Sequence, residues 1–339
     1  MNIKDIAKIS GVGVSTVSRV INNHPDVKDE TREKVLKIIK EVNFVPNNGA
    51  RMLKRNNLKH VGVLLKGVYN PFFAEILKTI SSEIEKQGYS MILQHYDNSS
   101  DEDIDKVVAF IKEKRLQGVI CLGGNFQNLN DDRLINIKKP IVLTSVSTDE
   151  GTKLKNISVI GIDNKKAGYE ATKYLIEKGH RNLAIILGKS DDWCIGNLRL
   201  EGFKKALKDY NIEFDEKSVL LGDFDFNKAY LETLNLLKKN KNITGIFAIS
   251  DIMAIGAAKA VFRSNMKVGE DISIIGFDGL EMAKFYEPSI TSIKQPMDHM
   301  AKESVKLLFD LIKGESNHKQ VVLPIKLIEG ESCKDLNKK

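Results

Sequence analysis

The sequence predicts an N-terminal all-α helix-turn-helix headpiece, followed by a larger α/β body of two lobes built from parallel, Rossmann-like sheets. Three observations predict this division. Two short runs with helical apolar spacing meet at a pair of glycines near the N-terminus. After His60 the pattern changes to apolar strands that alternate with amphipathic helices. The first 60 residues hold 12 Lys+Arg and 6 Asp+Glu, and so carry +6 of the chain's net charge of +7.

The composition indicates a soluble globular protein of two or three domains. The chain has 339 residues, 42% hydrophobic and 29% charged, and no apolar run approaches the length of a membrane span. The N-terminus shows no signal-peptide pattern. Cys121, Cys194 and Cys333 are scattered, so we expect a reducing, cytoplasmic compartment with neither a disulfide framework nor a zinc site.

The first apolar run lies in residues 3–9, where positions 3, 6, 7 and 9 fall on one face of a short helix. Ser10, Gly11 and Gly13 are expected to break this helix. The second run is apolar at positions 14, 17, 20 and 21. Two short helices joined by a turn that contains glycine make a helix-turn-helix, although an ordinary helical hairpin inside a core is the alternative.

The outward face of the second helix carries small hydroxyl side chains and one cation, Arg19. Small hydroxyls allow a close approach to phosphates and base edges, and an arginine suits a bidentate contact to guanine in a major groove. The basic charge of the first 60 residues indicates a polyanion as the partner. A basic tail kept for solubility is the alternative, but such a tail would lack helical periodicity.

The segment Thr16-Val17-Ser18-Arg19-Val20-Ile21-Asn22, preceded by Gly11-Val12, resembles the headpiece of the LacI/GalR family of bacterial transcription regulators. The resemblance implies a homodimer that binds a near-palindromic operator in double-stranded DNA. It implies that Val14 and Ser15 choose bases, with Arg19 as a further base contact. Phosphate contacts are implied for Lys4, Thr16, Ser18 and Asn22.

A third helix is predicted at about 29–43, with an apolar face formed by Val35, Leu36, Ile38, Ile39 and Val42. Two positions depart from the family pattern. Gly13 stands where the family usually has a serine N-cap, and Lys28 precedes the third helix, which we expect Asp29 to cap instead. Three helices of this size make a very small core, so the headpiece is expected to be only marginally stable alone.

Residues 46–58 are predicted to link the headpiece, residues 1–45, to the body, residues 59–339. Pro46 interrupts the pattern, and the run 47–55 is too short a helix to persist alone in water. This run resembles the family's hinge helix, which folds on DNA when two subunits meet. The resemblance implies that Leu53 is a wedge in the minor groove. Further DNA contacts are implied for Asn47, Ala50 and Arg51. Gly49 takes a place more often filled by a larger residue, which loosens the hinge, and a plain flexible linker is the alternative.

The body shows two sets of alternating strands and helices, which predict parallel sheets covered on both faces. Strands are predicted at 61–65, 89–93, 118–122, 140–143, 183–187, 244–249, 272–275 and 320–323. Helices are predicted at 71–87, 101–114, 164–178, 194–210, 227–239, 251–264 and 297–313.

The two sets form two lobes, and the resemblance implies the two-lobed clamp of periplasmic sugar-binding proteins. The resemblance, rather than the pattern, supplies three crossings between the lobes, near 160–163, 290–295 and 323–326. We therefore expect an N-lobe of about 59–160 and 293–322, and a C-lobe of about 161–292 and 323–333. The tail from Glu329 is short and polar without heptads, which favours a dimer over a tetramer.

Open parallel sheets bind ligands beyond the carboxyl ends of their strands. The polar and aromatic residues expected there are Asn70, Phe72, Phe73, Asn125, Asp163, Phe224 and Asp251. Alternative roles stay open for most of these residues. Asn70, Asp101 and Asp251 also fit helix caps, and the three phenylalanines also fit the core.

Arg199, Asp278 and Trp193 are the stronger candidates for effector binding. Arg199 matches the family's effector-clamping arginine, and Asp278 matches a carboxylate that contacts the effector. A guanidinium facing a carboxylate can hold vicinal hydroxyls in fixed geometry, while a structural salt bridge is the alternative. Trp193 is the only tryptophan and fits either a platform for a sugar ring or a core residue. Purine-responsive family members have an arginine at about this place, so the tryptophan favours a sugar.

The sequence does not indicate an enzyme. It contains no phosphate loop ending in Gly-Lys-Ser/Thr, no complete G-x-G-x-x-G and no H-E-x-x-H, and its histidines are dispersed. We expect no catalytic residues, no cofactor and no metal. A transport receptor for sugars would share the body but would need a signal peptide and no headpiece.

We therefore predict a homodimeric repressor of carbohydrate-utilisation genes, controlled by a small sugar or sugar derivative bound between the lobes. Two alternatives keep the DNA-binding role and change the trigger. One is a phosphorylated carrier protein that acts as corepressor, and the other is a purine.

Overall fold

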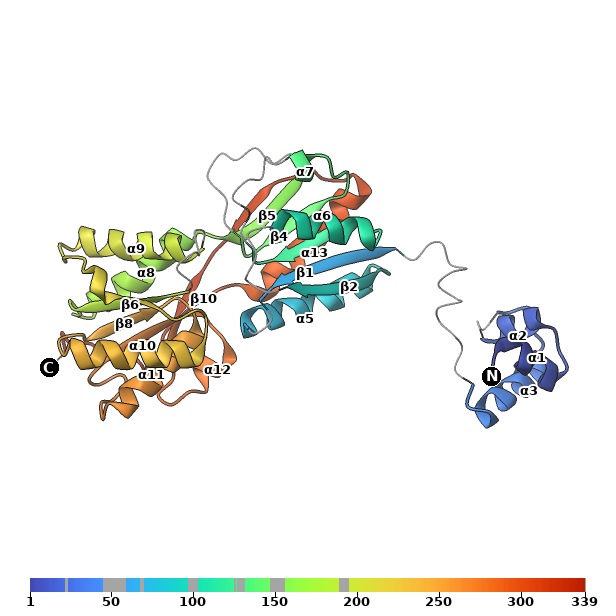
Figure 1. Cartoon of the computed structure of the whole chain (residues 1–339), viewed down its shortest axis with the longest axis horizontal. Helices are drawn as coiled ribbons and strands as arrows, with labels where there is room; N and C mark the ends of the chain where they lie inside the picture. The colour runs from blue at the N-terminus through green and yellow to red at the C-terminus, as the bar shows by residue number, and fades with distance from the viewer. Residues whose placement is uncertain are drawn as a thin grey trace. The chain divides into compact units, whose positions relative to one another are not determined.

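The computed structural model forms two compact units, Met1–Leu58 and Lys59–Lys339 (Figure 1). It describes residues 1–21, 24–44, 59–67, 70–96, 103–124, 126, 132–146, 156–188 and 195–338. The first unit is a helical headpiece, and the second is an α/β body with two sheets. The predicted fold class is confirmed.

The headpiece consists of α1 (Ile3–Ser10), α2 (Val14–Ile21) and α3 (Asp29–Glu41). Its core is small, as the lengths of the helices require. The residues buried in it are Ile6, Ala7, Val17, Val20, Val27 and Val35. Three apolar residues expected on the buried faces are instead exposed, namely Ile9 (52%), Val14 (42%) and Leu36 (47%). The spacing of apolar residues predicts a buried face on each helix that is wider than the face its two neighbouring helices can cover.

The ends of these helices correct two expectations about capping. Ser10 does not break α1 but is its buried last residue, and its hydroxyl donates to the carbonyl of Ile6 at 2.6 Å. Gly11 ends the helix in the left-handed conformation (φ 66°). Asp29 does not cap α3, because Lys28 is the N-cap and makes no side-chain capping bond. At the start of α1, Asn2 and Asp5 form a reciprocal capping box that the apolar spacing did not predict.

The N-lobe contains a six-stranded parallel sheet in the order β11-β5-β4-β3-β1-β2 (Figure 1). Its strands are β1 (His60–Lys66), β2 (Ser90–Tyr96), β3 (Val119–Leu122), β4 (Ile141–Thr144), β5 (Ile157–Ile162) and β11 (Gln320–Leu323). Its helices are α5 (Pro71–Lys86), α6 (Asp103–Glu113), α7 (Asp132–Ile135) and α13 (Met297–Lys313). Neighbouring residues of β1 alternate between two cores, with Val63 in one and Leu64 in the other, so both faces of the sheet are covered.

The C-lobe contains a second sheet in the order β12-β10-β9-β8-β6-β7, parallel except for the pair β10 and β12. Its strands are β6 (Leu183–Leu187), β7 (Val219–Leu221), β8 (Gly245–Ala248), β9 (Ser273–Asp278), β10 (Thr291–Lys294) and β12 (Lys326–Ile328). Its helices are α8 (Asn164–Glu177), α9 (Ile195–Asp209), η1 (Glu216–Ser218), α10 (Phe226–Lys239), α11 (Asp251–Arg263) and α12 (Glu281–Lys284). Helix α8 packs on α9, and α10 packs on α11.

The chain passes between the two sheets three times, after β5, after β10 and after β11. The ends of these strands fall within the three expected ranges, although each lies one or two residues beyond the expected lobe boundary. Strand β5 stays in the first sheet to Ile162, β10 stays in the second sheet to Lys294, and Leu323 still belongs to β11. Strands β5, β7, β10 and β12 and helices α7 and α12 were not predicted as elements.

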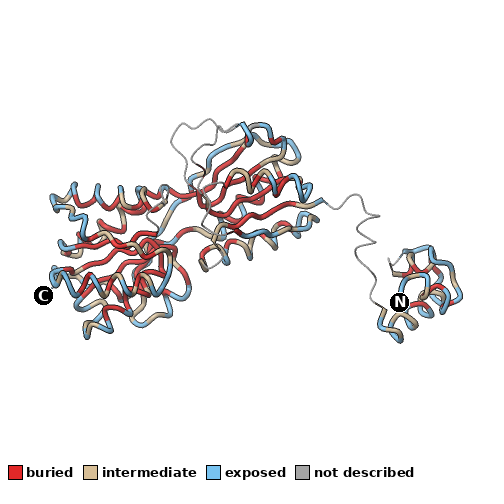
Figure 2. Tube along the Cα trace, viewed as in Figure 1, coloured by how far each residue is buried: buried red, intermediate tan, exposed pale blue. Residues whose placement is uncertain are grey.

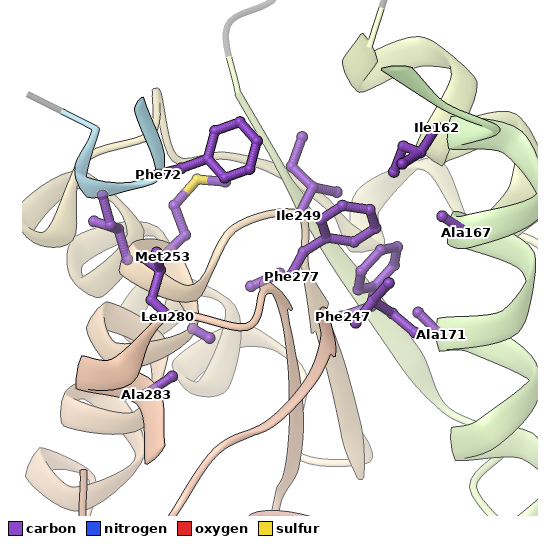
Figure 3. Close-up of a cluster of buried hydrophobic side chains, with 14 of the residues drawn as sticks. Phe72, Ile162, Ala167, Ala171, Phe247, Ile249, Met253, Phe277, Leu280 and Ala283 are labelled. Carbon is purple, nitrogen blue, oxygen red and sulfur yellow. The ribbon is translucent and has the colours of Figure 1, made fainter. Parts of the chain in front are cut away.

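One buried hydrophobic cluster extends through both lobes of the body. Figure 2 shows the central strands buried along most of their length, while the helices alternate between buried and exposed positions. The edge strands β2, β11 and β12 are mostly exposed or half-buried. The cluster includes Phe72 from α5 and Met253 from α11, and Figure 3 shows the ring of Phe72 directed toward the Met253 side chain. Phe247 and Phe277 pack in the same cluster with ring centroids 6.4 Å apart.

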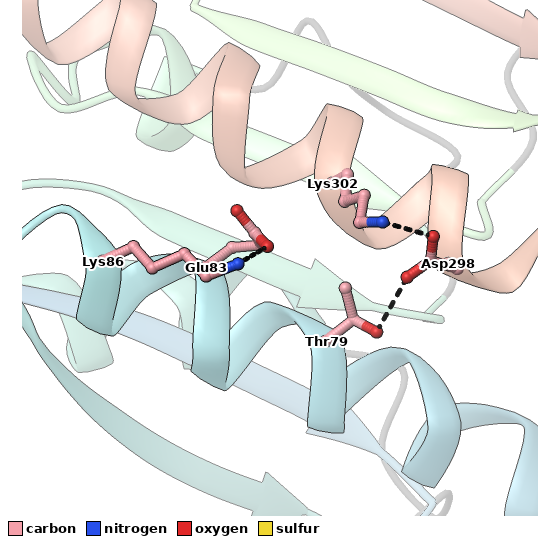
Figure 4. Close-up of polar contacts among 5 residues, drawn as sticks. All are labelled: Thr79, Glu83, Lys86, Asp298 and Lys302. Atoms are coloured by element: carbon pink, nitrogen blue, oxygen red, sulfur yellow. Dashed lines mark hydrogen bonds and ion pairs between the residues drawn. The ribbon is translucent and has the colours of Figure 1, made fainter.

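Polar contacts join α5 to α13 on the surface of the N-lobe (Figure 4). Asp298 of α13 accepts a hydrogen bond from the Thr79 hydroxyl at 3.3 Å and pairs with Lys302 at 2.7 Å. Lys86 pairs with Glu83 along α5 at 2.6 Å. Exposed pairs of this kind contribute at most about 1 kcal/mol each, so the apolar cores determine the position of these helices.

Two glycines set the close crossing of α8 and α9. A Cβ atom at Gly168 would overlap the backbone of Arg199, and one at Gly202 would overlap the carbonyl oxygen of Lys165. Backbone blocks both positions, so a side chain there cannot be accommodated by a rotamer change. This crossing therefore fixes the position of α9 against the second sheet.

We predict that Gly202→Ala destabilises the body by about 3 kcal/mol, because the added methyl group forces α8 and α9 apart. Glu201→Ala, at the neighbouring exposed position, should cost less than about 0.5 kcal/mol. Equilibrium denaturation monitored by circular dichroism measures both. Equal stabilities of the two variants would contradict a crossing set by backbone contact.

Candidate effector site and nucleic-acid interface

Helix α2 presents a polar outward face because its two apolar residues on the opposite side are buried. Val17 and Val20 lie in the headpiece core, whereas Val14, Ser15 and Arg19 are exposed. Residues 15 and 19 are one helical turn apart and so project from the same side. The face proposed to read bases is therefore accessible.

The other predicted contacts of the headpiece differ in their exposure. Lys4 is exposed on α1, and Thr16 and Ser18 are half-buried beside the outward face of α2. In the turn between the helices the backbone of Val12 donates to the carbonyl of Ala7 at 3.1 Å. The carbonyl of Gly13 accepts the first bonds of α2, from the backbone of Thr16 at 2.9 Å and of Val17 at 3.1 Å. Asn22, Asn47, Ala50, Arg51 and Leu53 lie outside the described residues.

In the body, Arg199 of α9 is buried beneath the carboxyl ends of β8 and β9. Its guanidinium lies 3.6 Å from the centroid of the Phe277 ring. Its Nε donates to the Asn164 side chain at 3.0 Å, and one terminal nitrogen donates to the carbonyl of Ile249 at 2.6 Å. The arginine is therefore held in one orientation by α8, β9 and the segment after β8.

Asp278 ends β9 and is 3% exposed. Gln295 donates to its Oδ1 atom at 2.8 Å, while Oδ2 has no hydrogen-bond partner within the described part of the chain. Its backbone has φ 110°, which L residues rarely adopt and which costs about 1–3 kcal/mol. A strained, buried carboxylate with one open oxygen is a typical ligand-binding group.

The ionisation of Asp278 depends on its surroundings. Burial raises the pKa of its carboxyl to about 8, although the Arg199 guanidinium lowers that pKa and the charge of Asp251 raises it further. Burial likewise raises the pKa of Asp251 to about 7, against the lowering effect of the hydrogen bond from Ser292. The two acids thus disfavour each other's charge.

Asp251 is held by protein groups on both of its oxygens. Ser292 donates to Oδ1 at 2.6 Å, and the backbone of Leu280 donates to Oδ2 at 2.6 Å. It does not cap α11, because Ser250 is the N-cap and accepts from the backbone of Met253. Asp251 therefore fixes the loop that follows Asp278.

Several predicted polar contacts serve as helix caps in the structure. The Asn70 side chain accepts from the backbone of Phe72 at 3.0 Å at the start of α5. Asp163 accepts from the backbone of Lys166 at 2.8 Å at the start of α8. Both caps occur just after β1 and β5, at the carboxyl edge of the first sheet. Asn125, Asp101 and Trp193 lie outside the described residues.

The three predicted phenylalanines differ in burial. Phe72 is 2% exposed and belongs to the core. Phe73 is half-buried and lies over Gly123, where a Cβ atom would stand only 2.8 Å from the ring. Phe224 is half-buried, has φ 54°, and covers Gly188 so closely that a Cβ atom there would overlap its ring. Phe73 and Phe224 thus keep partly exposed rings beyond their strands.

Sequence reasoning missed Gln295 and Ser292. Gln295 is buried at the passage between the lobes, and its amide orients Asp278. Its place directly before Pro296, after the strand β10, was the available signal. Ser292 lies within β10, whose polar sequence did not predict a buried strand.

Among the described residues, no group of three His, Cys, Asp or Glu side chains is placed to hold a metal ion. No helix in the described part of the chain is both long and apolar enough to cross a membrane.

Comparisons with known proteins match both units. A model described as bacterial regulatory proteins, lacI family, matches residues 2–47, and one described as a periplasmic binding protein-like domain matches residues 172–333. The HTH-type transcriptional regulator MalR of Clostridium butyricum is 53% identical over 98% of this chain and 99% of that protein. The HTH-type transcriptional repressor PurR of Aliivibrio fischeri is 33% identical over 94% of each. A solved transcriptional regulator CelR–cellobiose complex has a TM-score of 0.71 and 29% identity, covering 98% of this chain and 99% of that one.

We predict that the stability of the body falls as the pH rises from about 5.5 to about 7.5. Asp278 has a folded-state pKa of about 8, far above its value in the unfolded chain, so the folded state holds a proton that the unfolded state has lost. Asp278→Asn should flatten this dependence and raise the unfolding temperature near pH 7.5. Thermal unfolding at several pH values measures both. An unchanged slope in the variant would show that Asp278 is already ionised in the folded state.

Proposed function

The chain belongs to the LacI family of bacterial transcriptional regulators, and from this premise we propose that it represses carbohydrate-utilisation genes under control of a neutral sugar. The family is not one of enzymes, and its members bind DNA through the helix-turn-helix unit described above. The sugar is proposed to bind between the lobes, at the carboxyl ends of the two sheets.

The open Oδ2 atom of Asp278 is the observation that carries this proposal. A buried carboxylate without a donor is costly unless a ligand supplies one, and a sugar hydroxyl is such a donor. A hydroxyl that donates to Oδ2 stabilises the ionised form of Asp278 and so lowers its raised pKa. With the ligand bound, the negative charge of Asp278, together with that of Asp251, then opposes the single positive charge of Arg199. An anionic ligand is therefore disfavoured compared with an uncharged polyol.

The relatives support a sugar as the effector, although some of them fit the purine alternative. The solved CelR complex holds cellobiose, whereas the PurR relatives share about a third of this sequence. The half-buried rings of Phe73 and Phe224 suit stacking on the apolar face of a sugar, and so does Trp193. Of the other residues expected at the site, Asn70, Asn125 and Asp163 are proposed to line it. The buried Phe72 and Asp251 are proposed to position it from the core.

On the DNA side, two headpieces of a homodimer are proposed to read the half-sites of a near-palindromic operator. Val14, Ser15 and Arg19 contact bases, and Lys4, Thr16, Ser18 and Asn22 position the phosphates. The linker contributes Asn47, Ala50, Arg51 and Leu53 in the minor groove. Such a protein acts where the operator is, in the cytoplasm. A phosphorylated carrier protein remains the alternative trigger, and no described contact favours it.

We predict that the fluorescence of Trp193 changes saturably when the protein is titrated with one neutral sugar from a panel of cellobiose, maltose, ribose, glucose 6-phosphate and hypoxanthine. Asp278→Asn should weaken that response roughly 10- to 100-fold, because it removes a charge-assisted hydrogen bond. The same variant should stay folded, so its affinity for the sugar should fall while its unfolding temperature near pH 7.5 rises.

A response to hypoxanthine would replace the sugar with a purine. Silence across the panel would favour the carrier protein. Unaltered sugar affinity in Asp278→Asn would remove Asp278 from the site.

We predict that Arg19→Ala lowers the preference for the operator over random duplex roughly 10- to 100-fold, because it removes a bidentate hydrogen-bonding group that reads a base. The operator is first selected from a random duplex library with the unaltered protein, and affinities are then measured by fluorescence anisotropy. Lys37→Ala, on α3, serves as the charge-matched control and should keep the preference. A retained preference in Arg19→Ala would exclude Arg19 from base reading.

A further inference from the structure

Arg115 has an unusual backbone conformation for its residue type. It lies just after α6 with φ 51°, in the left-handed region that favours glycine or asparagine. Seven other helix ends of the described chain also have a left-handed residue within two positions. Those residues are Gly11, Asn43, Gly88, Gly179, Asn211, Asn265 and Gly314. Arg115 alone among these places a long cationic side chain where the backbone disfavours one.

Arg115 belongs to the amino-terminal edge of the first sheet, where the segments that precede neighbouring strands lie side by side. Gln117 donates from its backbone to the carbonyl of His60 at 2.8 Å, and Val119 donates to Pro140 at 3.1 Å. The Lys139 side chain donates to the Gln117 side chain at 3.1 Å. At the far side, Val159 donates to Lys319 at 3.1 Å. The starts of β1, β3, β4, β5 and β11 thus form one continuous edge.

This edge concentrates positive charge. We call basic edge the set Lys59, Lys112, Lys114, Arg115, Lys138, Lys139 and Lys319. All are exposed except Lys139, which is half-buried. Within residues 61–339 the edge has six basic residues against three acidic neighbours, Glu113, Glu303 and Glu315, which gives +3. The whole of residues 61–339 carries only +1, so the rest of the body is net negative.

Structural roles do not account for this charge. Cations after α6 complement the helix dipole, but Lys138 and Lys59 do not follow that helix. In the described part of the chain, Lys112, Lys114, Arg115 and Lys138 form no ion pair, and Lys319 reaches Glu303 only at 3.8 Å. Lys59 lies over the Tyr89 ring at 5.6 Å. Most of the positive charge therefore faces solvent without a partner.

The chain itself indicates the partner. β1 begins at His60, so the polypeptide that comes from the DNA-binding headpiece enters the body at this edge. The fourteen residues between Phe44 and Lys59 span at most about 50 Å when fully extended. A headpiece bound to an operator thus keeps this edge near the same duplex, which is dense in phosphate.

We propose that the basic edge is a second DNA-contact surface, which binds backbone phosphates without reading sequence while the headpiece reads bases. The proposal rests on the DNA-binding function of the family and goes beyond it, since it assigns a DNA contact to the regulatory body. The left-handed Arg115 is explained as a residue kept for its side chain despite the backbone cost.

The test compares two triple variants of the full chain on a labelled 40-base-pair duplex of arbitrary sequence. Lys114→Gln, Arg115→Gln and Lys138→Gln together neutralise the basic edge. The control, Lys238→Gln, Lys239→Gln and Lys241→Gln, removes the same charge from exposed positions before β8, in the C-lobe. Anisotropy titrations from about 50 to 300 mM salt give affinity and its salt dependence.

We expect the basic-edge variant to lower the slope of log affinity against log salt by about 0.9 for each phosphate that the substituted side chains no longer neutralise. At 50 mM salt this corresponds to about tenfold weaker binding per phosphate. The control should match the unaltered protein. Equal slopes for the two triple variants would overturn the basic edge as a DNA surface and leave the DNA-binding function intact. Failure of the unaltered chain to bind any duplex would overturn both.

Arg115→Gly separates the contribution of the Arg115 charge to DNA binding from its contribution to stability. It removes the guanidinium and also relieves the left-handed strain, so we expect a higher unfolding temperature together with weaker binding to the same duplex. A lower unfolding temperature with unchanged DNA affinity would show that Arg115 has a structural role instead, and would contradict the proposal.

Discussion

The burial of Asp278 beside Arg199 is the constraint on which the organisation of the C-lobe depends. The guanidinium is packed on Phe277 and bonded to Asn164 and the Ile249 carbonyl, so α8, β8, β9 and α9 all meet at it. Its position requires the close crossing of α8 and α9, which the glycines at 168 and 202 permit. A charged group can be buried only when its partners are fixed. The packing of α8, β8, β9 and α9 thus holds the buried polar groups around Arg199 in place.

The headpiece, in contrast to the C-lobe, has a small core and many exposed side chains. Among the described residues its core contains six buried hydrophobic side chains, so we expect its stability to be small and much of its surface to be free for contact. Val14 shows the consequence, because this apolar residue is 42% exposed on the outward face of α2. An exposed valine adds nothing to the hydrophobic core, but it suits contact with a thymine methyl group in a major groove. The small number of buried apolar residues therefore accounts both for the expected low stability of the headpiece and for the surface that it offers to DNA.

Sequence periodicity predicted most strands and helices of the body, because parallel sheets buried on both faces give continuous apolar runs. It failed for β10, where Thr291 and Ser292 are polar yet buried. Their hydroxyls bond to distant residues, since Ser292 donates to Asp251 and Thr291 accepts from the backbone of Gly330. The sequence also left open whether Asp251 caps α11, and the structure gives that role to Ser250, because either neighbour fits an N-cap and only tertiary structure decides. Arg199 and Asp278 were identified from motif resemblance, but Gln295 was not. Its bond to Asp278 joins residues 17 positions apart, and no local pattern encodes such a pair.

Gln295 offers a route by which the ligand proposed to bind Asp278 would affect the rest of the molecule. Its backbone donates to the Asp278 carbonyl at 3.1 Å, and its side chain donates to the carboxylate. The next residues lead from β10 directly into α13 of the other lobe. α13 packs against α5 and against β3, β4 and β5, so a shift of Gln295 displaces an element of the N-lobe core rather than a surface loop. If a ligand binds at Asp278 as proposed, packed cores that do not deform continuously would convert the change in its hydrogen bonds into a movement of whole lobes. The N-lobe would then carry that movement to the edge where the chain from the headpiece enters.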